Sequence, residues 1–358
     1  MDIRLSKQDR AKVKTLLTNK ETNIAVAEML GDLCLIRDEE AQAYIKENLN
    51  NNIRIEEIAT SILGVDKNDS TNNEIIKKYI NNQIDVINDE IFVNNPYNLQ
   101  IKPAKLNNNQ YSLSFEHYPE FSFFPLDDIS VEANTYIEKS SIAIFKNEYR
   151  FLCLKKDSDI WMCITPNEIK TMEKAISQSH GHVLTYGLGL GYYAFMTSNK
   201  KEVSKVTVVE SDENIINIFL TYLLPQFPNR DKIEIIKEDA YNHYQKIVKK
   251  EYDFCFVDIY HDANDGAMVF AKFLAMEKEY LKPQFWIETS LIAMIRRCLL
   301  TIIEEAIVGG NPIIYTKSKN DEDKLINYLY NKTKMISLVS YDDIISLLTD
   351  SSIKAILR

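Results

Sequence analysis

The segment that most constrains this chain is 182–196, HVLTYGLGLGYYAFM, in which three glycines follow a short apolar run at alternate positions. The chain has only nine glycines among its 358 residues, so the grouping of Gly187, Gly189 and Gly191 is unusual for it. Glycine is needed where the backbone takes a positive φ or where another group approaches the main chain closely. The run before the glycines predicts a buried strand, and the residues after them predict a helix. A strand, a glycine turn and a helix together present free N–H groups to a cofactor.

Strands and helices alternate from this turn onward, and the alternation predicts an α/β fold. The strand-like segments are HVLTY, KVTVVE, IEIIKED, YDFCFVD, QFWIE and NPIIYT, and a helical pattern separates each from the next. Such alternation is typical of a parallel sheet covered by helices. We therefore predict a Rossmann-like, parallel-rich sheet with helices on both faces over 165–318. Thr165, Pro166 and Glu168 predict a capping box that opens an amphipathic helix just before it.

The regions on either side have different patterns. Residues 1–105 show the spacing of helices, 106–164 show the alternation of strands, and 319–358 predict short helices with one strand, MISLVS. In the β-rich part the predicted strands are YSLSFEHY, the two halves of SIAIFKNEYRFLCLKK, and DIWMCI. The predicted organisation is a helical N-terminal domain, a small β-rich segment, the α/β domain and a helical C-terminal extension.

Charge and composition exclude several classes of function. A formal net charge of −10 disfavours nucleic acid as a partner, because backbone binding needs clustered positive charge. No apolar stretch is long enough to span a membrane, and the N-terminus has no secretory signal core. The five cysteines are scattered and form no C-x-x-C pair, which argues against a disulfide framework and against a zinc site. We expect a cytoplasmic protein without a metal, with a small-molecule or protein acceptor and a homodimer as a possible assembly.

Each of the first four predicted strands of the α/β region ends in a residue suited to a nucleoside ligand. The first ends in Tyr186 and the glycine turn, and the next three end in Glu210, Asp239 and Asp258. Ligands bind at the carboxyl ends of parallel strands, so these groups would face one cleft. Glu210 lies where an acid accepts hydrogen bonds from ribose hydroxyls in dinucleotide sites. Asp239 could accept from the exocyclic amine of an adenine, with the Ala240 N–H facing the ring.

Each of these residues also has a simpler interpretation. Glycines serve ordinary tight turns, and an acid at a strand end often caps the following helix. The segment 189–194, GLGYYA, also satisfies the G-x-G-x-x-A pattern of NAD sites. That pattern requires neither Asp239 nor the FVDIYHD segment. We therefore favour a nucleoside cofactor other than NAD.

The segments VLTYGLGLGY, VTVVESD, IEIIKEDAY and YDFCFVDIYHD together resemble the successive motifs of class I S-adenosylmethionine-dependent methyltransferases. Within that superfamily they look closest to the spermidine synthase-like branch, which also has a β-rich segment before the cofactor domain. The resemblance covers about 165–290. It implies S-adenosyl-L-methionine as the cofactor and Asp258 beside the sulfonium and the nucleophile. The cofactor-binding residues implied are Tyr186, Gly187, Gly189, Gly191, Glu210, Asp239, Ala240 and Asp258.

The chain departs from this branch on the acceptor side. Aminopropyl-transferring members typically carry an acid between the glycines, where this chain has Leu188 and Leu190. They also carry a second acid three residues after the first, and here that residue is His261. A polyamine needs anionic groups for its distant ammonium, so methyl transfer is favoured over aminopropyl transfer. The predicted catalytic residues are Asp258, His261 and Tyr260. His261 would be the base, because imidazole exchanges protons near neutral pH, although a histidine on a surface loop is the simpler interpretation. Tyr260 would orient the acceptor or stack on it.

Further expectations concern the residues near this loop. Asp262 or Asp265 could hold the imidazole or a cationic acceptor. Trp161 and Trp286 are predicted to pack in the core, and Glu288 either faces the cleft or caps a helix. The competing interpretation of the whole chain is a regulatory protein that binds a nucleoside cofactor without catalysis. In that case the helical ends would bind partners.

Overall fold

The computed structural model describes residues 1–106, 110–309 and 320–358. Its α/β region is built on a parallel five-stranded sheet with the order β10-β9-β8-β11-β12. The strands are β8 (Gly181–Tyr186), β9 (Val203–Glu210), β10 (Ile233–Lys237), β11 (Phe254–Val257) and β12 (Gln284–Phe285). The chain winds outward from β8 to β10 and then crosses back to β11 on the other side of β8. This doubly wound order confirms the predicted Rossmann-like, parallel-rich sheet.

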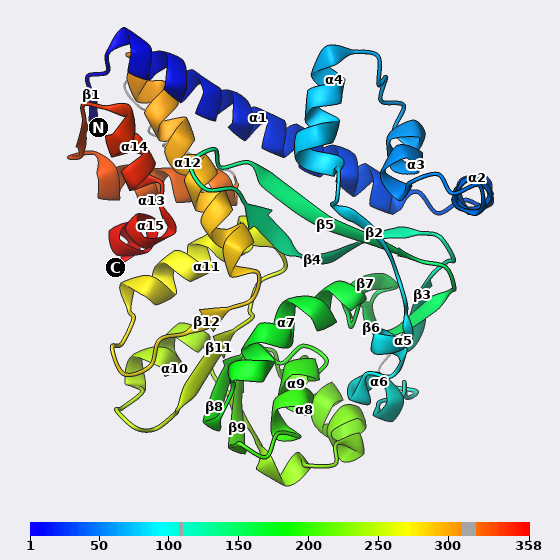
Figure 1. Ribbon diagram of the computed structural model, residues 1–358. Coiled ribbons are helices and arrows are strands. Elements are labelled where there is room, and N and C mark those ends of the chain that lie inside the picture. The colour runs from blue at the N-terminus through cyan, green and yellow to red at the C-terminus, as the bar shows by residue number, and fades with distance from the viewer. Residues whose placement is uncertain (107–109, 310–319) are drawn as a thin grey trace.

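Helices cover both faces of this sheet (Figure 1). They are α7 (Pro166–Gln178), α8 (Tyr192–Ser198), α9 (Glu213–Ile218), α10 (Ala240–Lys246), α11 (Ala263–Ala275) and α12 (Glu288–Val308), with short helical turns at Phe219–Leu223, Leu224–Gln226 and Arg230–Lys232. On one face Tyr193 of α8 stacks on Phe256 of β11, with ring centroids 4.3 Å apart. On the other face Tyr186 of β8 packs against Phe273 of α11 at 5.4 Å. Aromatic pairs of this kind add to the apolar area that holds the helices on the sheet. The predicted strand NPIIYT lies outside the described residues.

Two three-stranded sheets precede the α/β region. One has the order β2-β5-β4, with β2 (Ile84–Ile87), β4 (Phe123–Val131) and β5 (Glu138–Phe145). The other has the order β3-β6-β7, with β3 (Tyr111–Tyr118), β6 (Tyr149–Lys156) and β7 (Asp159–Cys163). The strands predicted from YSLSFEHY, from SIAIFKNEYRFLCLKK and from DIWMCI are confirmed. We did not predict β4, since Pro125 and the acidic pair after it break the alternation.

The first hundred residues are mostly helical, with one correction. The helices are α1 (Lys7–Leu35), α2 (Glu39–Asn50), α3 (Ile55–Ile62), α4 (Ser70–Ile75) with a π-helical turn at Ile76–Ile80, α5 (Glu90–Val93) and α6 (Pro96–Gln100). Our all-helical assignment is wrong at β2, which pairs in parallel with β5. This short strand was missed because its run is only four residues long. The N-terminal region therefore shares a sheet with the β-rich segment.

The two ends of the chain lie together. The short strand β1 (Asp2–Ile3) pairs with β13 (Ser337–Leu338), which lies between α13 (Asp321–Thr333) and the helices α14 (Tyr341–Leu347) and α15 (Asp350–Leu357). The predicted tail of short helices with one strand is thereby confirmed. Helix α1 runs beside α12 in Figure 1, and the Lys20 ammonium of α1 lies 3.0 Å from the Glu304 carboxylate of α12. Within the described ranges, no helix combines the length and apolar character needed to cross a bilayer.

A covalent link between β6 and β7 contradicts the expectation from the cysteine pattern. Cys153 and Cys163 are direct cross-strand partners and form a disulfide. Facing residues in an antiparallel pair have adjacent Cβ atoms, which is the separation that a disulfide needs. The pairing was missed because it depends on strand register and not on a sequence motif. The other cysteines, Cys34, Cys255 and Cys298, are buried thiols.

Candidate functional site

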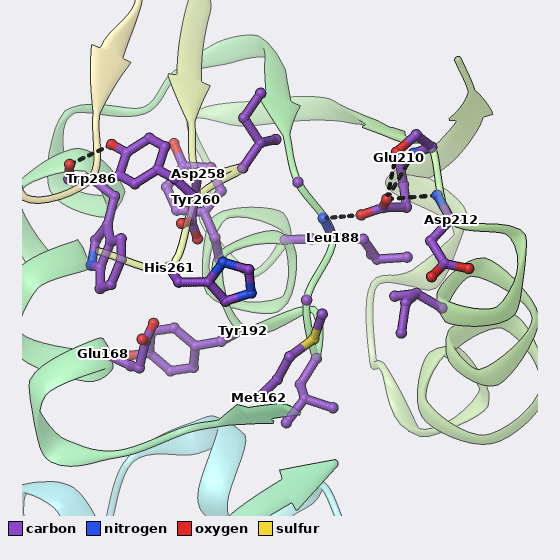
Figure 2. A pocket seen from close by; sticks show the side chains of 18 of the residues that line it. Met162, Glu168, Leu188, Tyr192, Glu210, Asp212, Asp258, Tyr260, His261 and Trp286 are labelled. Carbon is purple, nitrogen blue, oxygen red and sulfur yellow. Dashed lines mark hydrogen bonds between the residues drawn. The ribbon is translucent and has the colours of Figure 1, made fainter. Parts of the chain in front are cut away.

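A cavity of about 540 Å³ lies at the carboxyl ends of β8, β9, β10 and β11. This volume is within the range of small-molecule sites, about 300–1,000 Å³. The position is the one where the winding direction of the sheet reverses, which is where open α/β sheets bind ligands. Strand β7 and the first turn of α7 close the cavity from the side of the β-rich segment. We call this cavity the glycine-turn pocket; Figure 2 shows its lining.

The three glycines between β8 and α8 all have positive φ, at 95° for Gly187, 51° for Gly189 and 78° for Gly191. A Cβ on Gly187 would lie 1.8 Å from the carbonyl oxygen of Asp258, so the turn can approach the next strand only with glycine there. A Cβ on Gly189 would meet no atom within 4 Å. Among the described residues, the N–H groups of Gly189 and Leu190 have no hydrogen-bond acceptor. The predicted glycine turn is present, and it leaves space and donors for a ligand.

Glu210 at the end of β9 is held beside this turn. Its carboxylate accepts hydrogen bonds from the N–H groups of Leu188 at 3.2 Å, Ser211 at 2.7 Å and Asp212 at 2.8 Å (Figure 2). Charge-assisted bonds of this kind fix both the carboxylate and the turn before any ligand arrives. Its role toward ribose hydroxyls remains a prediction, made from this position in the pocket.

Asp239 and Ala240, at the start of α10, also line the pocket. One carboxylate oxygen of Asp239 accepts the N–H of Asn242 at 2.9 Å, so this residue is a helix cap, as the simpler interpretation had it. Capping uses only one of its two oxygens. The proposed contact between Asp239 and an adenine amine therefore remains open, with the Ala240 N–H next to it.

Two carboxyl groups from different elements face the pocket without a hydrogen-bond donor among the described residues. Asp258 follows β11, and Glu168 comes from the first turn of α7. Burial raises the pKa of Asp258 from 3.8 to about 7. Burial, followed by the negative charge of Asp258, raises the pKa of Glu168 well above its ordinary value. Neither carboxyl accepts a hydrogen bond from any residue that the structure describes.

Glu168 was not among our site residues, because we assigned it to a capping box. Thr165 does cap α7 by accepting the Glu168 N–H at 3.3 Å, but the Glu168 side chain does not return the bond. It points into the pocket instead, as Figure 2 shows. The sequence offered one signal: this acid lies on a helix that leads directly into the glycine-turn strand. That signal does not distinguish a cap from a site residue.

The described lining of the glycine-turn pocket is acidic. It contains no lysine and no arginine, and His261 is its one basic side chain. The carboxyl groups are those of Glu168, Glu210, Asp212, Glu238, Asp239 and Asp258. Low-dielectric walls strengthen the field of such a cluster. The pocket therefore favours a ligand that carries positive charge.

His261 lies at the mouth of the pocket with its imidazole mostly exposed. Its Nδ1 is 3.0 Å from a carboxylate oxygen of Asp265, and its backbone N–H donates to the same carboxylate. Asp262 instead caps α11 by accepting the Asn264 N–H at 2.7 Å. Of the two acids that we considered, Asp265 therefore orients the imidazole. A base held by a third group is the usual arrangement of a proton acceptor in a site.

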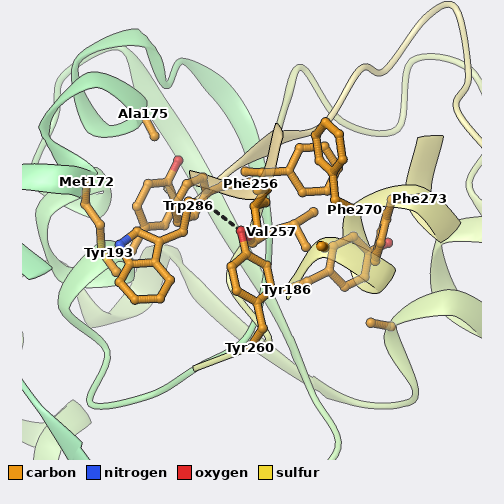
Figure 3. Close-up of a cluster of buried hydrophobic side chains, with 14 of the residues drawn as sticks. Met172, Ala175, Tyr186, Tyr193, Phe256, Val257, Tyr260, Phe270, Phe273 and Trp286 are labelled. Atoms are coloured by element: carbon orange, nitrogen blue, oxygen red, sulfur yellow. Dashed lines mark hydrogen bonds between the residues drawn. The ribbon is translucent and has the colours of Figure 1, made fainter. Parts of the chain in front are cut away.

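Tyr186 and Tyr260 are placed differently from our expectations. The hydroxyl of Tyr186 lies 3.0 Å from Nδ1 of His243, and its ring is buried against α11 outside the pocket (Figure 3). Adjacent residues of a strand point to opposite faces, so the end of β8 turns this side chain into the core. Tyr260 has a ring on the pocket wall, but its hydroxyl donates to the carbonyl of Trp286 (Figure 3). The hydroxyl is therefore engaged in the core and is not free to orient a methyl acceptor, whereas stacking of the ring on an acceptor stays a prediction.

Of the two tryptophans, one packs in the core and one lines the pocket, and Glu288 lies outside the pocket. Trp286 packs in the core, as predicted, with 7% of its surface exposed. Trp161 does not: it is 38% exposed on β7, lines the pocket and lies edge-on to His261. Glu288 begins α12 and pairs with the Lys354 ammonium at 2.6 Å, away from the glycine-turn pocket. The sequence analysis therefore missed one wall of the pocket, which β7 provides.

No family model and no curated protein matches this chain. Solved structures similar to it include a spermidine synthase from Thermotoga maritima, 16% identical over 41% of this chain and 58% of that one, with a TM-score of 0.31. A spermidine synthase in complex with the transition state analogue AdoDATO is 18% identical over 41% and 60%, with a TM-score of 0.32. An O-methyltransferase from Bacillus cereus in complex with SAH is 15% identical over 45% and 65%, with a TM-score of 0.28. The matched region thus spans about 60% of the length of these spermidine synthases.

Proposed function

We propose that this chain is an S-adenosylmethionine-dependent methyltransferase whose acceptor is an amine. The observation that carries the proposal is the meeting, in one pocket, of the glycine turn, the prepositioned Glu210 carboxylate and an acidic lining without lysine or arginine. The first two suit a nucleoside, and the third suits a cation.

The residues present fit this cofactor. The open space beside Gly189 gives room for the ligand next to the backbone, and the N–H groups of Gly189 and Leu190 can receive a carboxylate such as that of a methionine tail. Glu210 and Asp239 provide acceptors for the ribose hydroxyls and the adenine amine. When bound, S-adenosylmethionine supplies a methyl group activated by its sulfonium. The acidic lining favours that positive charge.

On the acceptor side, Glu168 and Asp258 offer two carboxyl groups that no protein donor engages. An ammonium group has three donors and a positive charge, so it matches such a pair. An ammonium must lose a proton before its nitrogen can act as a nucleophile. Asp258, with a pKa of about 7, can accept that proton at neutral pH. His261, held by Asp265 at the mouth, can pass it to solvent.

Aminopropyl transfer from decarboxylated S-adenosylmethionine is the second candidate, and one observation favours it. Glu168 provides, from α7, a second carboxyl beside Asp258, in place of the acid that the loop after β11 lacks. The decarboxylated cofactor also carries no carboxylate, so its net positive charge is higher. The two candidates differ in whether the pocket prefers the cofactor with or without that carboxylate.

Calorimetric titration of the purified protein with S-adenosylmethionine, its decarboxylated form and NAD tests the proposal. We expect the first to bind most tightly, and Glu210→Gln to weaken it. Transfer of a labelled methyl group to a panel of amines, with alcohols as the comparison, then tests the acceptor. Glu168→Gln should slow this transfer, while Glu173→Gln, an exposed acid on the same helix, should not. Preference for the decarboxylated form would establish the second candidate, and binding without any transfer would favour the regulatory interpretation.

A further inference from the structure

Strand β7 is both a wall of the glycine-turn pocket and one end of the disulfide. Five consecutive residues, Ile160–Ile164, line the pocket, and Cys163 is one of them. Its partner Cys153 on β6 has 0% of its surface exposed. Cys163 is half-buried and lines the pocket, so the two residues of the pair differ in their exposure.

Few other interactions hold β7 in place. It is an edge strand that pairs with β6 alone, and the pairing shifts register between Leu154 and Lys155. The first three residues of β7, Asp159–Trp161, are exposed. The disulfide joins β7 to β6 at the end of the strand nearest to α7, which carries Glu168. It therefore fixes the part of β7 that forms the pocket wall.

We propose that Cys153–Cys163 is a redox-modification site at which small thiols and disulfides control how tightly the glycine-turn pocket holds its ligand. The crosslinked wall is the binding form, and the reduced wall is the weaker one. The modification itself does not depend on the proposed function; its effect on ligand affinity rests on the pocket being the cofactor site.

The exchange balances with small thiols as the reductant. A thiolate attacks Sγ of Cys163, the Sγ–Sγ bond breaks, and Cys153 leaves as a thiolate that takes a proton. A second thiolate attacks the mixed disulfide and releases Cys163, which also takes a proton. Two small thiols are thereby oxidised to one small disulfide, and the protein gains two electrons and two protons. A small disulfide drives the same steps in reverse.

Reduction lets the wall move because β7 is then held only by its ladder with β6 and by packing. Trp161 and Met162 gain freedom that a ligand must restrict again, so affinity falls. Coupling between linked sites is commonly about 5- to 150-fold. The linkage is reciprocal, so a tenfold difference in affinity shifts the midpoint potential of this two-electron couple by about 30 mV on ligand binding.

The other cysteines allow a selective readout. Cys34, Cys255 and Cys298 are buried, and burial raises the pKa of Cys34 and Cys298 to about 12 and that of Cys255 further. Their thiols are therefore poor nucleophiles at neutral pH. Alkylation of the folded protein should report on the β6–β7 pair.

The first experiment uses no ligand. The full chain is equilibrated in glutathione buffers of graded potential, alkylated, and mapped by mass spectrometry, with hydrogen exchange of 159–163 measured at both extremes. We expect alkylation at Cys163 before Cys153, only under reducing conditions, together with faster exchange in β7. Resistance to reduction in the folded state, or exchange that is equal in the two states, would overturn the proposal without touching the proposed function.

The second experiment titrates S-adenosylmethionine into oxidised and reduced protein. We expect weaker binding after reduction, and Cys153→Ser should bind at the reduced level in both buffers. Cys34→Ser, which changes a residue of another core cluster outside the pocket lining, should keep the redox dependence, and thermal melting checks that both variants are folded. Equal affinity in the two redox states refutes the control of the pocket. Absence of binding in both states refutes the proposed function instead, and the alkylation result then still decides whether the site is redox-active.

Discussion

Replacing Asp258 by asparagine tests the electrostatics of the pocket most directly. The substitution keeps the size of the side chain and the backbone hydrogen bond from Asp258 to the Tyr186 carbonyl, and it removes one buried charge. Burial raises the pKa of Asp258 from 3.8 to about 7. One pKa unit corresponds to about 1.4 kcal/mol. Once Asp258 is ionised, the free energy of unfolding is therefore lower by about 4 kcal/mol than it would be if this carboxyl were solvated in the native state.

The sign of the pH dependence follows from the direction of the shift. The folded protein holds the Asp258 proton more tightly than the unfolded chain does, so this group favours folding below pH 4. That advantage is lost as the pH rises toward 7. The contribution of Asp258 to the stability of the native protein should therefore fall over this window, so the difference in stability between Asp258→Asn and the native protein should widen. The expected advantage of the variant is about 1 kcal/mol at pH 4.5 and about 4 kcal/mol at pH 8.

The measurement is urea unfolding of both proteins, without ligand, at pH 4.5, 6 and 8. Asp239→Asn is the matched control, because it changes an acid at the next strand end and asparagine caps a helix as well as aspartate. Its stability should follow that of the native protein at all three pH values. Parallel curves for Asp258→Asn and the native protein would falsify the claim that this carboxyl is desolvated. In the transfer assay, the same variant should lose about 100-fold or more of its rate as a missing proton acceptor.

Four further results are expected. Gly187→Ala should lower the free energy of unfolding by about 3 kcal/mol in urea titrations, because its Cβ meets the backbone and its φ is unfavourable. Gly189→Ala also has an unfavourable φ, but its Cβ would meet no other atom, so it should lower the free energy of unfolding by only about 1 kcal/mol. Its Cβ should nevertheless block cofactor binding in calorimetry. Tyr186→Phe should lose about 1 kcal/mol with its bond to His243 and leave cofactor affinity unchanged, whereas Glu210→Gln should weaken the cofactor about tenfold or more.

The succession of strands along the chain and the position of the glycine turn could be predicted because both depend on short-range patterns. Apolar runs, their spacing and the glycine content are local properties, and a parallel sheet brings its carboxyl ends to one edge whatever its side chains are. This is why Glu210, Asp239 and Asp258 lie around one pocket, as we expected.

The predictions that were wrong or incomplete have a different origin. They depend on the direction of a side chain or on the register between two strands. Tyr186 is one residue before the glycine turn, and this parity points its ring to the face away from the ligand. The Cys153–Cys163 bond depends on which residues of β6 and β7 face one another. Glu168 satisfies the rule for a capping box in sequence, yet its rotamer points into the pocket. No local pattern specifies any of these outcomes.

Glu168 also changes how the sequence of the loop after β11 is interpreted. From the sequence, His261 in place of a second acid argued against aminopropyl transfer, because it removed an anionic group that the distant ammonium of a polyamine needs. The structure provides a second carboxyl from α7, close enough to Asp258 that burial and then the negative charge of Asp258 raise the pKa of Glu168. The acidity of an acceptor pocket is a property of everything that faces it. The sequence of one loop therefore underestimates how many carboxyl groups face this pocket.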